Sequence, residues 1–539
     1  MAAGRHSAVC RRRAARNFNL MQWSVRLMKV PETFETTVSI DTLRDKTILL
    51  TGASGFVGKV VLEKLLRCVG GNGRIFLLMR GNRRFPSAED RLYHEVLQSS
   101  LFDKLKSEQG AEFLENCLKK LHCLEGHLTQ PLFGLDHETF AATAFSLDLI
   151  INAAASVDFR EPLDDALKTN TLALDSLIDF SKFTPHCPLI HVSTCYVHGH
   201  HAGFCQEGNV VAFSGDLPLL DTGYVDTDAV VSSLQSRINV LYATISDIDE
   251  RQAALVDLGL EVANAYGWND TYTFTKWLGE QRLLNALQGR ALTVLRPSII
   301  ESVLKDPTPG WIEGLKVADA VIMAYAREHV MLFPGRPSAS IDIIPVDYVA
   351  NSILISAAEA LNAPCQHRFY QCGSSAENPV TLKTLIKLVR KASTTPGSGL
   401  DRLFPRQPKK SFVMVPAPLF KLITDGGLNY ERWNYRLRKT LGLSSSKRAL
   451  MKMETTVRLA VVFAFYTTQR YTFDNSELLA LADRLSPADR AAFPVSTADI
   501  DWAHYLGNIH LSGLNNFALK PRPKKPEEPK LLRRVDKAH

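Results

Sequence analysis

The clearest indication of the fold is T-I-L-L-T-G-A-S-G-F-V-G-K-V-V-L-E-K-L-L, residues 47–66. Its apolar start predicts a buried strand, and the helical spacing of its second half predicts a helix. Three glycines, Gly52, Gly55 and Gly58, fill the turn between them. Glycines let the backbone approach a pyrophosphate closely, and free amides at a helix start attract its charge. The stretch therefore predicts dinucleotide binding; the alternative is a tight turn that only packs a helix on a sheet.

Strand and helix signals alternate through the first three hundred residues. The expected strands are Thr47–Leu50, Arg74–Met79, Leu149–Asn152, Leu189–Ser193 and Leu292–Leu295. Helical spacing lies between them, over Lys59–Cys68 and Asp164–Phe180. Such alternation predicts βαβ units. The expected fold class is α/β, with a Rossmann-type doubly wound parallel sheet.

Composition changes mark the domain boundaries. A Ser/Thr/Pro/Gly cluster at Ala392–Lys410 predicts a linker, and helical segments follow it, over Glu477–Leu485 and Pro487–Phe493. We expect a Rossmann reductase domain over 42–395 and a mainly helical C-terminal domain over 400–520. Residues 1–41 form a basic leader expected to be disordered, and residues 521–539 form a basic tail. Alternatives for the leader are a start at Met21 or Met28 and a transit peptide.

The overall composition is that of a packed protein. The hydrophobic fraction is 45%, the charged fraction 22% and the net charge +7. The longest apolar run, Leu459–Tyr466, is far shorter than the roughly 20 residues of a spanning helix. The nine cysteines lack metal-type spacing, so we expect reduced thiols, a cytoplasmic location and no metal site. We expect no nucleic-acid partner. The basic tail either is solvated or contacts anionic lipid.

The second strand indicates which cofactor binds. It ends R-I-F-L-L-M-R-G-N-R-R, with no acidic residue where one would hold a ribose 2′-hydroxyl. Arg80 stands in that region, with Arg83 and Arg84 behind it. Guanidinium groups suit a 2′-phosphate, so NADP(H) is favoured. The alternative is that these arginines merely cover an exposed strand end.

The acid–base candidates are Tyr272 and Lys276, in D-T-Y-T-F-T-K-W-L-G-E. A spacing of four places both on one face of a helix. A phenol titrates near about 10, and we expect the neighbouring ammonium to lower the pKa of Tyr272. The run L-I-H-V-S-T-C-Y-V-H-G supplies Thr194 as a hydroxyl donor to a developing oxyanion. Cys195 is the alternative, as a nucleophile, although no His or Asp relay is evident.

These blocks resemble the extended short-chain dehydrogenase/reductases, and further stretches narrow the match. The stretches are I-N-A-A-A-S-V-D-F-R (151–160), V-L-R-P-S-I-I-E-S (294–302), P-T-P-G-W-I-E-G (307–314) and I-I-P-V-D-Y-V-A-N-S (343–352). They look like signatures of alcohol-forming fatty acyl-CoA reductases, closest to bacterial members associated with wax-ester formation. The long reach from Thr194 to Tyr272 also fits that family, which fills it with a helical insertion. The resemblance covers roughly residues 42–520.

The resemblance implies both a site and an activity. Expected catalytic residues are Thr194, Tyr272 and Lys276. Expected NADPH contacts are Thr51, Gly52, Ser54, Gly55, Phe56, Val57, Gly58, Arg80, Leu128, Ala153, Ala154, Ser193, Tyr272, Lys276, Pro297, Ser298 and Ile299. An insertion over about 200–268 is expected to cover the substrate site. His127 departs from the acidic residue common near the adenine, and Asn170 matches the family's helix Asn.

The implied reaction reduces a long-chain acyl-CoA through an aldehyde to a primary alcohol. Thr194 and Tyr272 would hydrogen-bond the thioester carbonyl, and Tyr272 would then protonate the aldehyde oxygen. Peripheral membrane contact is expected because the substrate is apolar. Three alternatives remain: a reductase acting only to or from aldehyde, a sterol or nucleotide-sugar dehydrogenase, and a non-catalytic NADPH-binding regulator. The long insertion and the G-W-I-E-G block disfavour the dehydrogenases.

Overall fold

The computed structural model describes residues 37–184, 186–211, 217–326, 332–363, 365–395, 397–408, 413–441, 464–466, 468 and 471–519. Contacts divide the chain into two units, Met1–Thr37 and Val38–His539, and the helices and strands belong to the second. Residues 1–36 of the predicted leader, the predicted tail 521–539 and most of the apolar run Leu459–Tyr466 lie outside the described residues.

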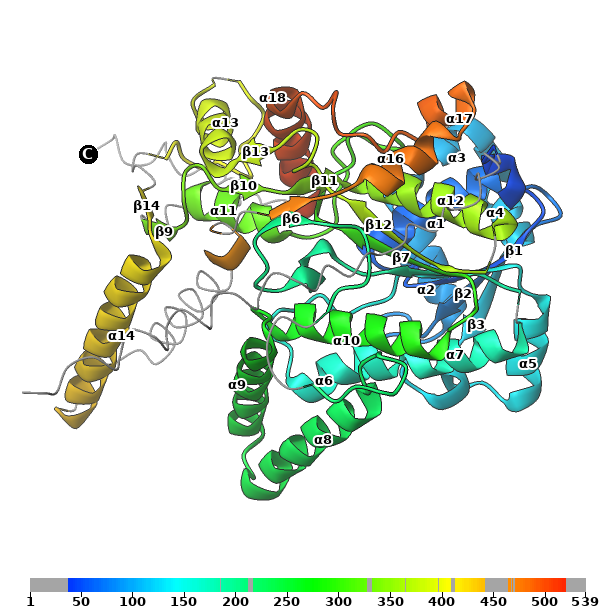
Figure 1. Cartoon of the computed structure of the whole chain (residues 1–539). Coiled ribbons are helices and arrows are strands. Elements are labelled where there is room, and N and C mark those ends of the chain that lie inside the picture. The colour runs from blue at the N-terminus through cyan, green and yellow to red at the C-terminus, as the bar shows by residue number, and fades with distance from the viewer. Residues whose placement is uncertain are drawn as a thin grey trace, which may run out of the picture. The chain divides into compact units, whose positions relative to one another are not determined.

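A seven-stranded parallel sheet forms the centre of this unit (Figure 1). Its order is β12 (His367–Cys372), β7 (Leu292–Pro297), β5 (Leu189–Val192), β4 (Leu149–Asn152), β1 (Thr47–Thr51), β2 (Arg74–Met79) and β3 (Leu121–Glu125). Strand order reverses between β1 and β4, which is the switch point of a Rossmann sheet. All five predicted strands are present, and their ends differ from prediction by at most two residues.

Helices cover both faces of the sheet because its strands are apolar on both sides. Ile48 and Leu50 of β1 belong to the core that includes α1 (Phe56–Cys68) and α12 (Val346–Asn362). Leu49 points to a second core, built with α5 (His137–Ser146), α7 (Leu174–Phe183) and α10 (Thr271–Ala286). Figure 1 shows the two helix layers on opposite sides of the sheet. The doubly wound α/β prediction is confirmed.

The connections contain shorter elements. Between β2 and β3 lie α2 (Ala88–Arg91), a π-helix (Leu92–Leu97), α3 (Asp103–Gln109) and α4 (Phe113–Lys120). The predicted helix Asp164–Phe180 is three pieces, α6 (Leu163–Leu167), a π-helical turn (Lys168–Leu172) and α7. Small two-stranded pairs join β8 (Ile299–Glu301) to β11 (Ile343–Pro345), and β10 (Ser340–Ile341) to β13 (Val380–Thr381).

The insertion predicted near 200–268 is helical. Its helices are α8 (Thr227–Thr244) and α9 (Ile248–Tyr266), which form a third core with Trp268 and Trp277 beside α10. Its first part contains β6 (Gly203–Cys205), which pairs with β15 (Tyr471–Phe473) from the C-terminal segment. The insertion therefore contacts both α10 and the C-terminal segment.

The C-terminal segment is mainly helical, as predicted. It contains α14 (Ala417–Thr440), α16 (Ser476–Asp483), α17 (Pro487–Ala492), α18 (Trp502–His504), a π-helix (Tyr505–His510), α19 (Leu511–Gly513) and a second π-helix (Leu514–Ala518). Before it lie α11 (Val317–Ala326), β9 (Leu332–Pro334), α13 (Leu382–Thr394) and β14 (Val413–Val415), which pairs with β9. No helix of the described part is long and apolar enough to cross a membrane.

Two predicted boundaries differ from the structure. The leader was expected to reach residue 41, but the Val38 amide donates to the Arg484 carbonyl at 3.0 Å, and a 3₁₀ helix covers Ile40–Leu43 with Ile40 and Leu43 buried. Packing against the C-terminal segment orders these residues. The residues after the linker do not separate as a second compact unit. One reason is the backbone approach of Gly513 to Gly310, where a Cβ on Gly513 would lie 1.9 Å from the Gly310 carbonyl oxygen.

Candidate active site

The glycine loop joins β1 to α1 in a form that needs its glycines. Gly52 has φ +75°, and a Cβ there would lie 2.7 Å from the backbone of Ala153 and Ala154 after β4. A Cβ on Gly58 would lie 2.0 Å from the Gly52 carbonyl oxygen. Gly55 is the N-cap of α1 and supplies no side-chain cap, so the first amides of that helix stay available to an anion. The loop geometry fits a pyrophosphate.

The other candidates follow the carboxyl ends of neighbouring strands. Ala153 and Ala154 follow β4, Ser193 and Thr194 follow β5, and Pro297 ends β7. Because the strands are parallel, their carboxyl ends meet at one edge of the sheet, where ligands of such folds bind. Ser193 Oγ and Ser298 Oγ are both buried and have no hydrogen-bond partner among the described residues. Two orphaned hydroxyls at this edge fit a polar cofactor.

Arg80 lies at the end of β2, as predicted, and contacts the residue that departs from the family pattern. Its Nη1 is 2.7 Å from His127 Nε2, and His127 Nδ1 is 2.9 Å from Thr129 Oγ1. The guanidinium is only a donor, so His127 Nε2 accepts its hydrogen bond, while Nδ1 faces the amide and the hydroxyl of Thr129. Burial, followed by the charge of Arg80, lowers the pKa of His127. His127 therefore holds Arg80 as a neutral acceptor, and Leu128 is half-buried beside it.

Thr194 and Tyr272 meet across the site. Thr194 is buried, its hydroxyl donates to the Pro297 carbonyl oxygen at 3.4 Å, and it lies near the Tyr272 phenol. Burial, and then the charge of Asp270, raises the pKa of Tyr272, while the neighbouring Thr194 hydroxyl opposes that rise. The sequence had predicted a lowered pKa, and that prediction is wrong in this structure because Lys276 is directed elsewhere. A raised pKa keeps the proton on the phenol, which suits a proton donor.

Lys276 ends a buried polar chain that sequence reasoning missed. The Thr51 hydroxyl donates to Asn152 Oδ1 at 2.5 Å, and Asn152 Nδ2 lies 3.0 Å from His191 Nδ1. His191 Nε2 in turn lies 3.2 Å from Lys276 Nζ. Burial lowers the pKa of Lys276 to about 8, and Nζ also bonds the Val192 carbonyl oxygen at 2.8 Å.

Asn170 connects the loop after β4 to α10. It lies in the π-helical turn, where its side chain bonds both backbone groups of Ser156, and its Nδ2 donates to Thr275 Oγ1 at 3.2 Å. It therefore positions the catalytic helix. π-Helical turns often mark functional positions.

The alternative nucleophile, Cys195, is poorly suited to attack. Its thiol is fully buried and donates to the Arg296 carbonyl oxygen at 2.9 Å. Burial raises the pKa of Cys195 well above its usual value. A thiol is nucleophilic as the thiolate, so this environment argues against an acyl-enzyme.

The G-W-I-E-G block packs on the glycine loop. Trp311 stacks on Phe56, with ring centroids 5.5 Å apart. Lys316 Nζ lies 3.9 Å from the Phe56 ring centroid, and Lys59 Nζ pairs with Glu313 Oε1 at 2.6 Å. These contacts support the first turn of α1. They explain why the G-W-I-E-G block occurs together with the glycine loop in this sequence. The contact joins residues that are far apart in the chain, so the spacing within either motif does not reveal it.

A tyrosine from the C-terminal segment also reaches the site. The hydroxyl of Tyr466 donates to Asp270 Oδ2 at 2.9 Å, and Asp270 caps α10 through the Thr273 amide. Phe159 lies between the rings of Tyr272 and Tyr466, 5.5 Å from each centroid. Neither Asp270 nor Tyr466 was predicted from the sequence. The D-T-Y-T start of the helix could have indicated Asp270 as its N-cap, whereas no comparable pattern marks Tyr466.

Comparisons with known proteins agree with this geometry. Residues 50–353 match one family described as "Male sterility protein", and residues 435–521 match a second family of the same description. The chain is 32% identical over 513 residues to "Fatty acyl-CoA reductase 2, chloroplastic" of Arabidopsis thaliana, covering 90% of this chain and 80% of that protein. It is 29% identical over 493 residues to "Alcohol-forming fatty acyl-CoA reductase" of Simmondsia chinensis, covering 89% and 98%.

Solved structures support the fold. The terminal R domain of the myxalamid PKS-NRPS pathway superposes with a TM-score of 0.52 at 18% identity, covering 87% of this chain and 90% of that one. The R domain of a nonribosomal peptide synthetase from Mycobacterium tuberculosis gives 0.50 at 18% identity, covering 89% and 94%. The chain therefore has the reductase fold, and its first matched segment binds a nicotinamide cofactor. The chain belongs to the male sterility protein family and is a fatty acyl-CoA reductase.

Proposed function

We propose that this enzyme uses NADPH to reduce long-chain fatty acyl-CoA, through the aldehyde, to the primary alcohol. The observation that carries the proposal is the placement of Thr194 near Tyr272 at the carboxyl edge of the sheet, where the glycine loop and the unpartnered Ser193 and Ser298 hydroxyls also lie. The relative from Simmondsia chinensis, which is named as alcohol-forming, favours the four-electron outcome. Acyl-CoA and fatty aldehyde are the substrates, and a role in wax-ester formation stays a prediction.

The choice of NADPH rests on Arg80. It is an exposed guanidinium directly after β2, where no acidic residue stands to hold a ribose 2′-hydroxyl, and it is hydrogen-bonded to His127. Ser54, Gly55, Phe56 and Val57 would hold the pyrophosphate. Arg80→Ala should lower the preference for NADPH over NADH by about tenfold or more, the loss of one charge-assisted contact. Arg74→Ala, at the opposite end of the same strand, is the matched control.

Different side chains of the site have different roles in the proposed reaction. Bound reduced nicotinamide supplies hydride. Thr194 and Tyr272 donate hydrogen bonds to the carbonyl oxygen as negative charge develops there. Tyr272, whose pKa is raised by burial, holds the proton that the alkoxide needs. Lys276 would bind the nicotinamide ribose. The residues that would line the nicotinamide side of the site are Ser193, Pro297, Ser298 and Ile299.

We also propose peripheral contact with an anionic membrane, in a cytoplasmic setting, through α14. Leu419, Leu422 and Trp433 are exposed on this helix. Arg432 and Arg436 lie on the same helix, as in helices that lie at a lipid interface. Sedimentation with anionic and neutral vesicles tests it: Leu422→Asp should reduce binding to the anionic ones. Equal binding of both proteins would remove α14 from the proposal.

The central test counts cofactor against coenzyme A. Purified enzyme is given palmitoyl-CoA and NADPH, and NADPH oxidised, coenzyme A released and lipid product are measured together. Two NADPH per coenzyme A with alcohol formed supports the proposal. One NADPH per coenzyme A with aldehyde accumulating would assign the enzyme to the aldehyde-forming class. No consumption with palmitoyl-CoA or fatty aldehyde would refute the substrate assignment.

A further inference from the structure

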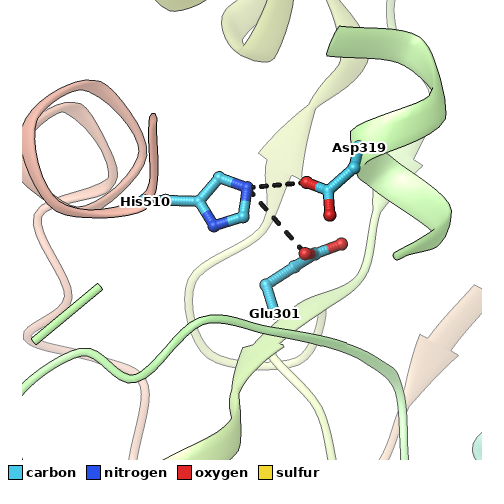
Figure 2. A group of neighbouring side chains, drawn as sticks. All are labelled: Glu301, Asp319 and His510. Carbon is cyan, nitrogen blue, oxygen red and sulfur yellow. Dashed lines mark hydrogen bonds and ion pairs between the residues drawn. The ribbon is translucent and has the colours of Figure 1, made fainter. Parts of the chain in front are cut away.

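Three ionisable side chains with no assigned part in the candidate active site form a buried group (Figure 2). Glu301 ends β8, Asp319 lies in the first turn of α11, and His510 ends the π-helix Tyr505–His510. All three are at 0% exposure. One ligand atom from each lies within 4.8 Å of the others. Glu301 and His510 are 209 positions apart in the chain, so the group forms only in the folded protein.

Each of the three side chains is oriented by its second polar atom. His510 Nδ1 lies 3.0 Å from Ser302 Oγ, Asp319 Oδ2 accepts the Lys316 amide at 2.6 Å, and Glu301 Oε1 accepts the Ala318 amide at 3.2 Å. The remaining atoms, His510 Nε2, Asp319 Oδ1 and Glu301 Oε2, turn toward one another (Figure 2). Metal-binding histidines are typically held in this way through the other ring nitrogen.

The group has no Lys or Arg at ion-pair distance among the described residues. Glu301 Oε2 has no hydrogen-bond partner there, and lies 3.8 Å from His510 Nε2. Lys316 is the nearest cation and its charge acts on both carboxylates, but its Nζ donates to the Glu313 carbonyl oxygen and lies over the Phe56 ring. Two fully buried carboxylates with one cation that contacts neither are costly.

We propose that Glu301, Asp319 and His510 bind one divalent transition-metal ion, of which zinc is the representative. Two carboxylate oxygens and one imidazole nitrogen are ordinary zinc ligands, at about 2.0–2.2 Å from the ion. His510 Nε2 and Asp319 Oδ1 are 2.9 Å apart, so a small outward shift would admit an ion in place of the shared proton. Two carboxylates and one divalent ion balance in charge.

The site has a structural role in this proposal. Glu301 and Asp319 lie in the segment 50–353 that matches the first family, and His510 lies in the segment 435–521 that matches the second. The ion would therefore fasten the C-terminal segment to β8 and α11. The Tyr505 hydroxyl, which donates to the Ser302 carbonyl oxygen at 2.7 Å, supports the same junction.

The test measures zinc content and melting temperature of the full chain. Protein freed of metal by chelation is incubated with zinc sulfate, passed through a desalting column and analysed by elemental mass spectrometry. Wild type should retain about one zinc per chain and melt higher with zinc than with chelator. Glu301→Gln preserves shape while removing a ligand charge, so it should retain about tenfold less zinc and melt at one temperature in both conditions.

His504→Ala is the matched control, because His504 is exposed on the same segment and outside the group. It should bind zinc as wild type does. Ser302→Ala removes only the hydroxyl that orients His510, and should weaken zinc binding by about tenfold without abolishing it. A wild-type protein that retains no zinc and melts alike in zinc and chelator would overturn the proposal, leaving a proton-sharing trio. Equal zinc retention by wild type and Glu301→Gln would overturn it too, placing the metal elsewhere.

Discussion

Replacing Tyr272 with Phe removes the proposed proton donor while keeping the packing of the aromatic ring. The ring packs edge-on against Phe159, with centroids 5.5 Å apart, and Phe keeps that contact. The variant loses one hydroxyl beside Thr194, and the loss of a single polar group of this kind costs about 1 kcal/mol of folding free energy. In a chain of this size that loss shifts Tm by about 2 °C or less. The glycine loop, Arg80 and Lys276 are unchanged, so NADPH affinity should stay near that of wild type.

Turnover should fall much further than stability. A positioned proton donor contributes about 10²–10⁴-fold to rate. The assay follows NADPH absorbance with palmitoyl-CoA and with a fatty aldehyde, while NADPH fluorescence gives the binding constant. Tyr196→Phe is the control, because Tyr196 is a buried ring near Tyr466 with no assigned part in the chemistry. If Tyr272→Phe turned over within a few-fold of wild type, Tyr272 would not be the proton donor.

Three further perturbations have defined outcomes. The pKa of Lys276 is lowered to about 8, and the ammonium is the form that binds ribose hydroxyls, so kcat/KM for NADPH should fall as pH rises through about 8; Lys276→Arg, still charged, should lose that dependence. In Gly58→Ala the new Cβ would lie 2.0 Å from the Gly52 carbonyl oxygen, and about 1–3 kcal/mol of strain should weaken NADPH binding about tenfold or more in a fluorescence titration. Glu280 and Arg296 form a fully buried pair at 2.7 Å, so Glu280→Ala should cost about 3–5 kcal/mol in urea unfolding; a loss below about 1 kcal/mol would mean that the pair is not buried.

The sheet and the glycine loop were predictable because they are local. The apolar runs of β1, β2 and β4 and the helix that follows Gly58 lie in short stretches, where periodicity alone indicates the element. The helical insertion followed from the family resemblance, and the helical C-terminal segment followed from the spacing of Glu477–Leu485 and Pro487–Phe493. The end of the leader was misplaced because Val38–Leu43 is held by Arg484 and α12, contacts that cross hundreds of residues.

The site was predictable only as a set of residues. Sequence indicated Thr194, Tyr272 and Lys276, but it suggested the wrong direction for the pKa of Tyr272. Burial and the charge of Asp270 raise that pKa, while Lys276 is turned toward Val192 and His191. The sequence also did not indicate that Asn152 and His191 connect to Lys276. Hydrogen bonds between neighbouring strands join residues that are far apart in the chain, so they produce no recognisable spacing in the sequence.

The elements, the nucleotide-binding turn and the family were evident in the amino-acid order alone, because they depend on residues close together along the chain. The folded chain was needed for the protonation of the site, the support of the glycine loop by Trp311 and the meeting of Glu301, Asp319 and His510. Burial and charge depend on everything that surrounds a group, and those surroundings come from distant parts of the chain. A metal-type spacing was absent from the sequence, yet folding brings three ligand atoms within 4.8 Å.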